Sequence, residues 1–286
     1  MFNYIIPVFN KEDLLLLTLK GVRECAGKKS VIYVIIDGCT DRSESILDDF
    51  MATTDLVVHK IHMPNVHMLK SVNAALRFVT GGFTVVMQDD IILDDPDLET
   101  KIEQLYVKMG PRLGVVSFRL ASNVVRTPLH EQIRLGSINP MIKEMNFIRS
   151  ADDHIRDDLK GEYGCFYPRM SAINGPNIIP WSVLGTIGIL DEKLAPYGFD
   201  DPDYCIRAMK AGYVNGLFPI RYRSDIEWGG TRRSKQFLQE VARVHKRNRQ
   251  YLWQKHGDFI EKTSKNFKAL SSCSPSSDLT QIPSFD

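Results

Sequence analysis

The stretch Phe83-Thr84-Val85-Val86-Met87-Gln88-Asp89-Asp90 decides how the rest of the chain is interpreted. Its β-branched and apolar residues predict a buried strand that ends in two adjacent carboxylates. Two neighbouring acids are costly to keep charged without a partner, and Mg²⁺ or Mn²⁺ prefers such oxygen ligands. In an open α/β sheet the carboxyl ends of strands are also where ligands bind. The stretch therefore predicts a cation or ligand site, although further acids just after it leave a plain solvated acidic loop as the alternative.

Size and composition limit the function classes. The chain has 286 residues, enough for one large α/β domain or two small ones, and a formal net charge of +1. A charge so close to zero gives no signature of nucleic-acid binding, so we expect no nucleic-acid partner. The five cysteines show neither CxxC nor zinc spacing, and the N-terminus lacks a signal-peptide pattern, which together predict a cytoplasmic protein with reduced thiols. No apolar stretch approaches the roughly 20 residues of a transmembrane helix, so any membrane contact is expected to be peripheral.

Short β-branched runs alternate with helical patterns in the first part of the chain, which predicts βαβ units and a mostly parallel sheet. The expected strands cover 4–8, 31–36, 56–61, 83–87, 113–118 and 213–218. The expected helices cover 11–24, 43–51, 68–79, 97–109 and 202–211, with N-caps at Asn10, Asp41 and Asp95. Residues 119–177 are less periodic and predict an irregular segment with only short helices, such as one at 152–159. Segments of this kind often carry specificity.

A helix is expected from residue 232 to about residue 256. Its apolar residues form one stripe, and Arg243, Lys246, Arg247 and Arg249 lie largely off it. The simplest interpretation is an amphipathic helix with a solvated basic face. The alternatives are attraction to an anionic membrane surface or to a pyrophosphate-carrying acceptor.

Four segments occur in a familiar order. They are Ile5 to Glu12 with its Pro7-Val8-Phe9-Asn10 turn, Val34 to Ser43 with Asp37-Gly38, Asn73 followed by Gln88-Asp89-Asp90, and Leu190-Asp191-Glu192 running on to Gly198-Phe199-Asp200-Asp201-Pro202-Asp203, Arg207 and Gly212-Tyr213. Together they resemble the family 2 glycosyltransferases, inverting enzymes of the GT-A fold that use nucleotide sugars. The resemblance covers most of the chain before the late helix.

The resemblance implies an α/β GT-A fold, with a mostly parallel central sheet flanked by helices and followed by a C-terminal amphipathic helix. We expect a glycosyltransferase domain over 1–231, with a nucleotide-binding half at 1–118 and an acceptor-side half at 119–231. A helical extension at 232–268 and a disordered tail at 269–286 would follow.

The function implied by the resemblance is inverting transfer of a sugar from a nucleoside diphosphate, most often UDP, to an acceptor hydroxyl with the help of Mn²⁺ or Mg²⁺. By analogy with the family, the acceptor is a glycan or is lipid-linked, and the role lies in polysaccharide or glycoconjugate synthesis. The expected location is the cytoplasm, with at most peripheral contact at the inner membrane face through the basic helix 232–256.

Asp201 stands where the family carries its general base, and the acids around it tend to raise its pKa, as a base requires. The alternative is that Asp201 is the N-cap of a helix whose first residue is Pro202. Arg207 lies one helical turn beyond Asp203 and is expected to pair with it.

The metal site is predicted by the same resemblance, with two departures from the family pattern. Asp90 is the expected direct ligand, whereas Asp89 is expected to face the ribose or sugar. Gln88 stands where the family usually has its first Asp, and Glu227 stands where many relatives have a metal-binding His. Glu227 is therefore a candidate replacement ligand; the alternatives are that the metal is held differently or is not needed.

The remaining candidates are expected to bind the donor or its sugar. Asn10 and the amides near it would meet the nucleoside, Asp37 would accept hydrogen bonds from ribose or base, and Lys70 and Asn73 share a helical face. Each has an ordinary alternative, such as a turn residue or a solvated lysine. The predicted substrate-binding residues are Pro7, Val8, Phe9, Asn10, Glu12, Asp37, Lys70, Asn73, Asp89, Trp181 and Asp200.

Two other function classes are alternatives to the transferase. A non-catalytic module that binds sugar nucleotides or glycans on the same fold is motivated by Gln88 and Glu227. A retained acid at the base position favours the enzyme, because binding alone requires no base. A sugar-1-phosphate nucleotidyltransferase should carry a glycine-rich, basic loop after its first strand, and the Pro7–Asn10 turn is not such a loop.

Overall fold

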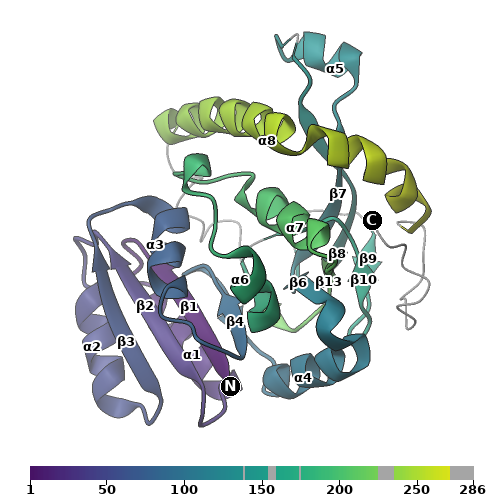
Figure 1. The fold of residues 1–286 in the computed structure, drawn as a ribbon. Coiled ribbons are helices and arrows are strands. Elements are labelled where there is room, and N and C mark those ends of the chain that lie inside the picture. Colours follow the sequence, from purple (N-terminus) through teal and green to yellow (C-terminus); the bar gives the residue numbers. More distant parts are fainter. Residues whose placement is uncertain (138, 154–158, 174, 225–234, 271–286) are drawn as a thin grey trace.

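The Phe83–Asp90 stretch lies in the middle of an eight-stranded sheet with the strand order β10-β13-β6-β12-β4-β1-β2-β3 (Figure 1). This computed structural model describes residues 1–137, 139–153, 159–173, 175–224 and 235–270. In chain order the elements are β1 (Phe2–Val8), α1 (Leu15–Cys25), β2 (Val31–Asp37), α2 (Ser43–Thr53), β3 (Val57–Met63), α3 (His67–Leu76), β4 (Phe83–Val86), β5 (Ile92–Leu93), α4 (Leu98–Met109), the 3₁₀ helix η1 (Gly110–Arg112), β6 (Leu113–Ser117), β7 (Leu120–Arg126), α5 (Leu129–Arg134), β8 (Ile142–Ser150), β9 (Lys160–Gly161), β10 (Tyr167–Pro168), β11 (Ser171–Ala172), β12 (Asn177–Pro180), α6 (Trp181–Ile187), the 3₁₀ helix η2 (Glu192–Leu194), α7 (Asp200–Lys210), β13 (Val214–Leu217), β14 (Tyr222–Arg223) and α8 (Lys235–Leu270).

The direction of the strands sets where each chain segment leaves the sheet. Strand β1 pairs in parallel with β2 and β4, β2 pairs in parallel with β3, and β6 pairs in parallel with β13. Two strands run the other way, β12 between β4 and β6, and β10 at the edge. The expected mostly parallel sheet is confirmed, and the turns after β1, β2 and β4 all lie at one edge of it.

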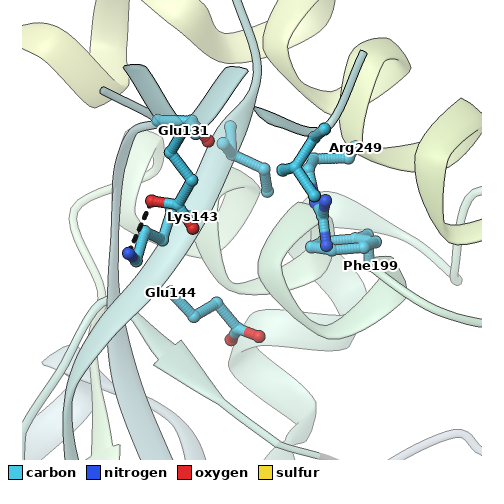
Figure 2. A pocket seen from close by; sticks show the side chains of 8 residues that line it. Glu131, Lys143, Glu144, Phe199 and Arg249 are labelled. Carbon is cyan, nitrogen blue, oxygen red and sulfur yellow. Dashed lines mark hydrogen bonds and ion pairs between the residues drawn. The ribbon is translucent and has the colours of Figure 1, made fainter. Parts of the chain in front are cut away.

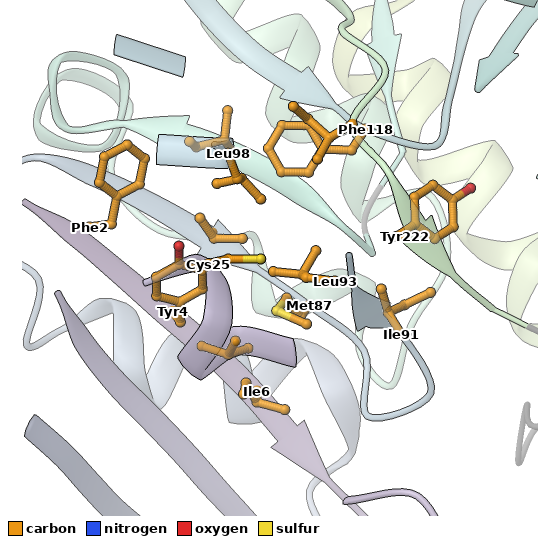
Figure 3. Packing of buried hydrophobic residues seen from close by; sticks show 14 of the residues in the cluster. Phe2, Tyr4, Ile6, Cys25, Met87, Ile91, Leu93, Leu98, Phe118 and Tyr222 are labelled. Carbon is orange, nitrogen blue, oxygen red and sulfur yellow. The ribbon is translucent and has the colours of Figure 1, made fainter. Parts of the chain in front are cut away.

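Both faces of the central strands are buried, which explains why β1 and β2 read as nearly continuous apolar runs. Residues such as Tyr4 and Ile6 pack on one side with helices α1, α2 and α4, whereas Ile5 and Ile35 pack on the other with α3, α6 and α7. Figure 3 shows the first cluster, in which Met87 and Leu93 lie beside Cys25 of α1. The end of β4 is therefore fixed by core packing immediately before its acids.

The expectation of an irregular segment at 119–177 was wrong. It forms a second sheet with the order β11-β7-β8-β9, and it supplies β12 and β10 to the main sheet. The polar residues of β7 obscured the pattern because they are buried and paired: the Oγ of Ser122 donates to Glu144 at 2.7 Å, and the Oδ1 of Asn123 accepts from the Met170 amide at 3.2 Å. The expected short helix around 152–159 lies mostly outside the described residues.

Of the three expected N-caps, Asp41 does serve the start of α2: its Oδ1 accepts from the amide of Ser43, the first residue of that helix, at 3.0 Å. The expected caps at Asn10 and Asp95 were wrong, because α1 begins only at Leu15 and α4 only at Leu98, and neither helix has a side-chain hydrogen bond from its capping residue. These two side chains make other contacts. The buried carboxylate of Asp95, for example, accepts two hydrogen bonds from Lys101 at 2.6 and 2.7 Å.

The late helix is confirmed as α8, and it packs across β7 and β8 (Figure 1). Val244, Leu252 and Ile260 are buried along it. The buried amide of Asn248 donates to the carbonyls of Leu194, Tyr197 and Gly198, at 2.7, 3.1 and 2.8 Å. The helix therefore holds the loop that leads into α7. Most of the expected disordered tail lies outside the described residues, and within the described residues we find no helix that meets the length and hydropathy of a membrane span.

Replacement of Asn248 by alanine should loosen this loop from α8. It leaves three backbone carbonyls without their donor, which we expect to lower the free energy of unfolding by about 1–3 kcal/mol. Urea unfolding measures the change, with Lys246→Ala, an exposed position on the same helix, as the control. Equal urea midpoints for Asn248→Ala and the wild type would show that the hydrogen bonds of Asn248 do not hold the loop.

Candidate active site

The turns after β1 and β2 are joined by side chains. The Oδ1 of Asn10 accepts from the Thr40 amide at 2.7 Å, and the carboxylate of Glu12 accepts from the Arg42 amide at 2.9 Å. In the other direction, Asp41 accepts from the Glu12 amide at 3.0 Å. Asn10 adopts a positive φ of 48°, which lets the chain turn sharply there. The predicted nucleoside-binding turn, from Pro7 to Glu12, is thus held rigidly against the Asp37–Ser43 turn.

Asp89 connects this pair of turns to the end of β4. Its Oδ2 accepts from the Phe9 amide at 3.1 Å, and its Oδ1 lies 3.7 Å from the ammonium of the buried Lys11. Burial raises the pKa of Asp89 to about 6; the charge of Lys11 works against this shift, and the neighbouring Asp90 adds to it. Asp89 is therefore a junction of three segments at the carboxyl edge of the sheet.

Asp90 is placed differently from Asp89. Its Oδ1 is buried and has no hydrogen-bond partner among the described residues. A desolvated carboxylate oxygen without a donor is unfavourable on its own, and a bound cation would compensate it. No group of three or more His, Cys, Asp or Glu within the described residues is arranged to hold a metal. A cation at Asp90 would thus need water or phosphate oxygens for most of its shell, as Mg²⁺ commonly does.

Of the two residues that depart from the family pattern, the structure describes Gln88 but not Glu227. Gln88 packs against Gly175, where a Cβ would come within 2.6 Å of the glutamine Cδ. Gly175 also has a positive φ of 75°. This close approach explains a glycine there, because any larger residue would displace Gln88. Glu227, the predicted second ligand, lies outside the described residues.

Asp37 and Asn73 are both buried and both hydrogen-bonded within the protein. The Oδ1 of Asp37 accepts from the Val66 amide at 2.7 Å, which closes the turn after β3. The Asn73 amide exchanges two 3.0 Å hydrogen bonds with the backbone of Leu190 and donates to Glu192 at 3.1 Å. Lys70 is exposed on α3. Substrate binding by these three residues stays a prediction, while their structural placement is clear.

The acids at the start of α7 divide into separate roles. Helix α7 begins at Asp200, after Phe199 with its positive φ of 66°, so the alternative in which Asp201 caps a helix starting at Pro202 was wrong. The Oδ1 of Asp200 accepts from the Gly198 amide at 2.9 Å. Asp201 lies in the first turn and is partly exposed.

Asp203 is fully buried, and it binds Arg207 as expected, at 2.9 Å. It also binds Lys255 at 2.6 Å and His256 at 2.9 Å, both from α8. Burial opposes ionisation, but the hydrogen bonds from His256 and Lys255 hold the pKa of Asp203 below its ordinary value. The third acid of the motif is thus a structural anchor between α7 and α8.

Trp181 does not join the other predicted residues. Strand β12 runs antiparallel to β4, so Pro180 pairs with Phe83 and Trp181 follows at the amino end of β4. The Trp181 amide donates to the carbonyl of Gly82 at 2.8 Å. This is the edge opposite Asp89 and Asp90, and we leave Trp181 out of the proposed site.

A pocket of about 260 Å³ lies beside the start of α7, and sequence reasoning missed it (Figure 2). Its labelled lining residues are Glu131, Lys143, Glu144, Phe199 and Arg249. Arg249 was expected on the solvated face of the late helix, yet its Nε is buried and its guanidinium lies 5.3 Å from the Phe199 ring centroid. The helical periodicity of the sequence could not predict the burial of Arg249, because it does not show that Phe199 packs on the polar face of α8.

Comparison with known proteins decides the family. The sequence profile of Glycosyl transferase family 2 matches residues 4–166, more than half of the chain. The chain belongs to glycosyl transferase family 2. The matched segment contains both joined turns and Asp89 and Asp90, and it ends before α7.

Solved structures show that this family 2 glycosyltransferase has the expected GT-A fold. TarS 1-349 from S. aureus matches with a TM-score of 0.56 and 15% identity, over 93% of this chain and 70% of TarS 1-349. The mannosyltransferase PcManGT from Pyrobaculum calidifontis, solved with GDP-Man and Mn²⁺, matches with a TM-score of 0.53 and 16% identity, over 76% of this chain. The match spans 54% of the mannosyltransferase. No curated protein sequence matches the chain.

The pairing of Lys11 with Asp89 should be measurable as a coupling free energy. At pH 7.5, above the Asp89 pKa of about 6, the carboxylate is ionised beside the Lys11 ammonium, so we expect Lys11→Met to cost at least about 1 kcal/mol more in the wild type than in an Asp89→Asn background. Urea unfolding of the four proteins in EDTA buffer gives this double-mutant cycle.

The pH dependence of the coupling follows from the raised pKa. The pKa of Asp89 in the folded protein lies above its ordinary value of 3.8, so the folded state holds this proton more tightly than the unfolded state does. The contribution of Asp89 to the free energy of unfolding is therefore lost as the pH rises through about 6. The attraction to Lys11 grows over the same range, because it needs the carboxylate. The coupling should therefore shrink when the cycle is repeated at pH 5, and a coupling that is equal at pH 5 and pH 7.5 would contradict the assignment.

Proposed function

We propose that this glycosyltransferase moves a sugar from a nucleoside diphosphate to an acceptor hydroxyl with inversion. The observation that carries the proposal is the junction at Asp89, where two rigidly joined turns meet the end of β4 and the neighbouring Asp90 has a buried oxygen with no partner among the described residues. Such an edge offers a nucleoside a rigid surface with the exposed Phe9 side chain on it, and offers a cation a carboxylate ligand, within one small region.

The donor we propose is a UDP sugar. The family makes UDP the commonest carrier, and TarS 1-349 in complex with UDP-GlcNAc matches 93% of this chain. In the proposal the nucleoside lies against the Pro7–Asn10 turn and Asp37. The carboxylate of Asp89 faces the ribose or sugar, and Glu12, Lys70, Asn73 and Asp200 complete the donor site directly or by holding its walls.

The proposed cofactor is Mn²⁺ or Mg²⁺, with Asp90 as its ligand and Glu227 as the second candidate. The unbonded Oδ1 of Asp90 fits a cation, and the Pyrobaculum structure contains Mn²⁺. When bound, the ion would screen the charge on the departing diphosphate.

Asp201 is the proposed general base. It would accept the proton of the acceptor hydroxyl while that oxygen forms a bond to the anomeric carbon and the bond from that carbon to the diphosphate breaks. The nucleoside diphosphate leaves with the bonding electrons. Of the three acids at the start of α7, Asp201 suits this role best, because Asp203 is fully buried in its ion pairs and Asp200 is bonded to the Gly198 amide.

The acceptor in this proposal is a glycan or a lipid-linked glycan, which fits polysaccharide or glycoconjugate synthesis in the cytoplasm. Peripheral contact with the inner membrane face would use exposed basic residues of α8, such as Arg243 and Lys246. No observation within the described residues favours the non-catalytic module over the enzyme.

Asp201→Asn should separate binding from chemistry. Calorimetric titration with UDP and GDP, with and without Mn²⁺, first establishes the carrier for the wild type. UDP release from UDP-GlcNAc, with water as the acceptor, then measures turnover. We expect Asp201→Asn to lower turnover by roughly 10²–10⁴-fold at unchanged nucleotide affinity, because a general base contributes about that much.

The control is Asp94→Asn. Asp94 is an exposed acid shortly after Asp90 in the chain, and it lies outside the proposed site. It should behave as the wild type. Unchanged turnover in Asp201→Asn would refute the base assignment, and failure of both nucleotides to bind the wild type would refute the proposed function.

A further inference from the structure

The pocket beside α7 is built by parts of the chain that lie outside the nucleotide-binding strands. Glu131 comes from α5, Lys143 and Glu144 come from β8, and Arg249 comes from α8 (Figure 2). Phe199, the residue just before α7, forms the wall nearest the proposed base. A cavity of about 260 Å³ is near the lower end of the range for small-ligand sites, which is around 300 Å³, and suits a single ring better than an extended ligand.

Arg249 is the group in this pocket that most needs a ligand. Its Nε is buried and makes no hydrogen bond to any residue that the structure describes, while its guanidinium lies over the Phe199 ring. Burial lowers the pKa of Arg249, and the carboxylates of Glu131 and Glu144 only partly offset this. A buried donor of a charged group that lacks an acceptor is costly, so an oxygen of a bound molecule would stabilise it.

The charges of the pocket are balanced, and this limits the class of ligand. Glu131 binds Lys143 at 2.6 Å, and Glu144 accepts from Ser122 at 2.7 Å. Two carboxylates therefore face an ammonium and a guanidinium. A phosphate or carboxylate ligand would meet both acids, whereas neutral hydroxyl groups can donate to the acids and accept from Arg249. The Phe199 ring and the neighbouring side chains of Leu135 and Ile142 supply an apolar surface for the face of a ring.

The pocket is also close to the proposed base. Phe199 precedes Asp201 by two residues in the chain. Strand β8 and helix α7, which begins at Asp200, also share one apolar cluster, in which Ile142 of β8 packs with Ile206 and Met209 of α7. Ile142 lines the pocket as well, so the pocket lies against the helix that carries Asp201.

We propose that this pocket is an acceptor subsite that holds one neutral, hydroxyl-rich sugar ring, with Arg249 and Glu144 binding its hydroxyl groups and Phe199, Leu135 and Ile142 forming its apolar wall. The proposal rests on the proposed function, since it names the acceptor class for the same reaction. In this proposal, the packing of α8 places Arg249 in the acceptor subsite at the start of α7.

The test is ligand-observed NMR on the full chain with defined sugars. The neutral probes are the methyl glycosides of glucose, galactose, mannose and N-acetylglucosamine, and the anionic probes are methyl glucuronide and glucose 6-phosphate. We expect a neutral glycoside to bind the wild type best. Arg249→Gln should weaken that binding by about tenfold or more, because it removes a charged hydrogen-bond donor.

Two controls make the result specific. Arg243→Gln is the same change on the same helix at a position where the side chain is 82% exposed, and it should bind as the wild type does. Nucleotide titration of Arg249→Gln should give the wild-type affinity, which shows that the protein is folded and that the donor site is intact. Glu144→Gln, a second and milder change in the pocket, should also weaken the neutral sugar.

The outcomes separate this proposal from the proposed function. Equal sugar binding by Arg249→Gln and the wild type, preference for an anionic probe, or no binding of any neutral glycoside would each overturn the acceptor subsite. If UDP and GDP also fail to bind the wild type, the proposed function falls as well. If a nucleotide binds normally while the sugars do not, only the subsite assignment is wrong.

Discussion

The structure of the site depends on one half-buried carboxylate, that of Asp89. It joins the turn after β1, through the Phe9 amide, to the end of β4, and it lies beside the buried ammonium of Lys11. The turn after β1 is in turn fixed to the turn after β2 through Asn10. The carboxyl edge of the sheet is therefore one rigid unit, which is what precise placement of a nucleotide requires.

Sequence reasoning was most reliable where packing follows a simple period. The parallel strands β1 to β4 and the helices between them were predicted because both faces of the strands are apolar and the helices are amphipathic. It failed at 119–177, where buried polar residues such as Asn123 pair across the sheet and remove the apolar alternation. It also failed for Trp181, because nothing in the local sequence shows that β12 runs antiparallel to β4.

The region around α7 depends on contacts that no local pattern contains. Asp203 and Asn248 link α7 and its preceding loop to α8, across more than 45 residues of sequence. These long-range contacts turn part of an apparently solvated basic face into the wall of a pocket, with Arg249 on Phe199. The family pattern places the acids of α7, but only the tertiary structure shows which of them are committed to ion pairs.

Paramagnetic broadening by Mn²⁺ in the presence of UDP is the most direct test of a cation site at Asp90. Amide resonances of Phe9, Asp89 and Asp90 should broaden strongly, whereas the indole resonance of Trp181, at the opposite edge of the sheet, should stay sharp. Asp90→Ala should abolish the broadening. Broadening centred near Trp181, or a pattern unchanged by Asp90→Ala, would contradict the assignment of this edge as the donor and metal site.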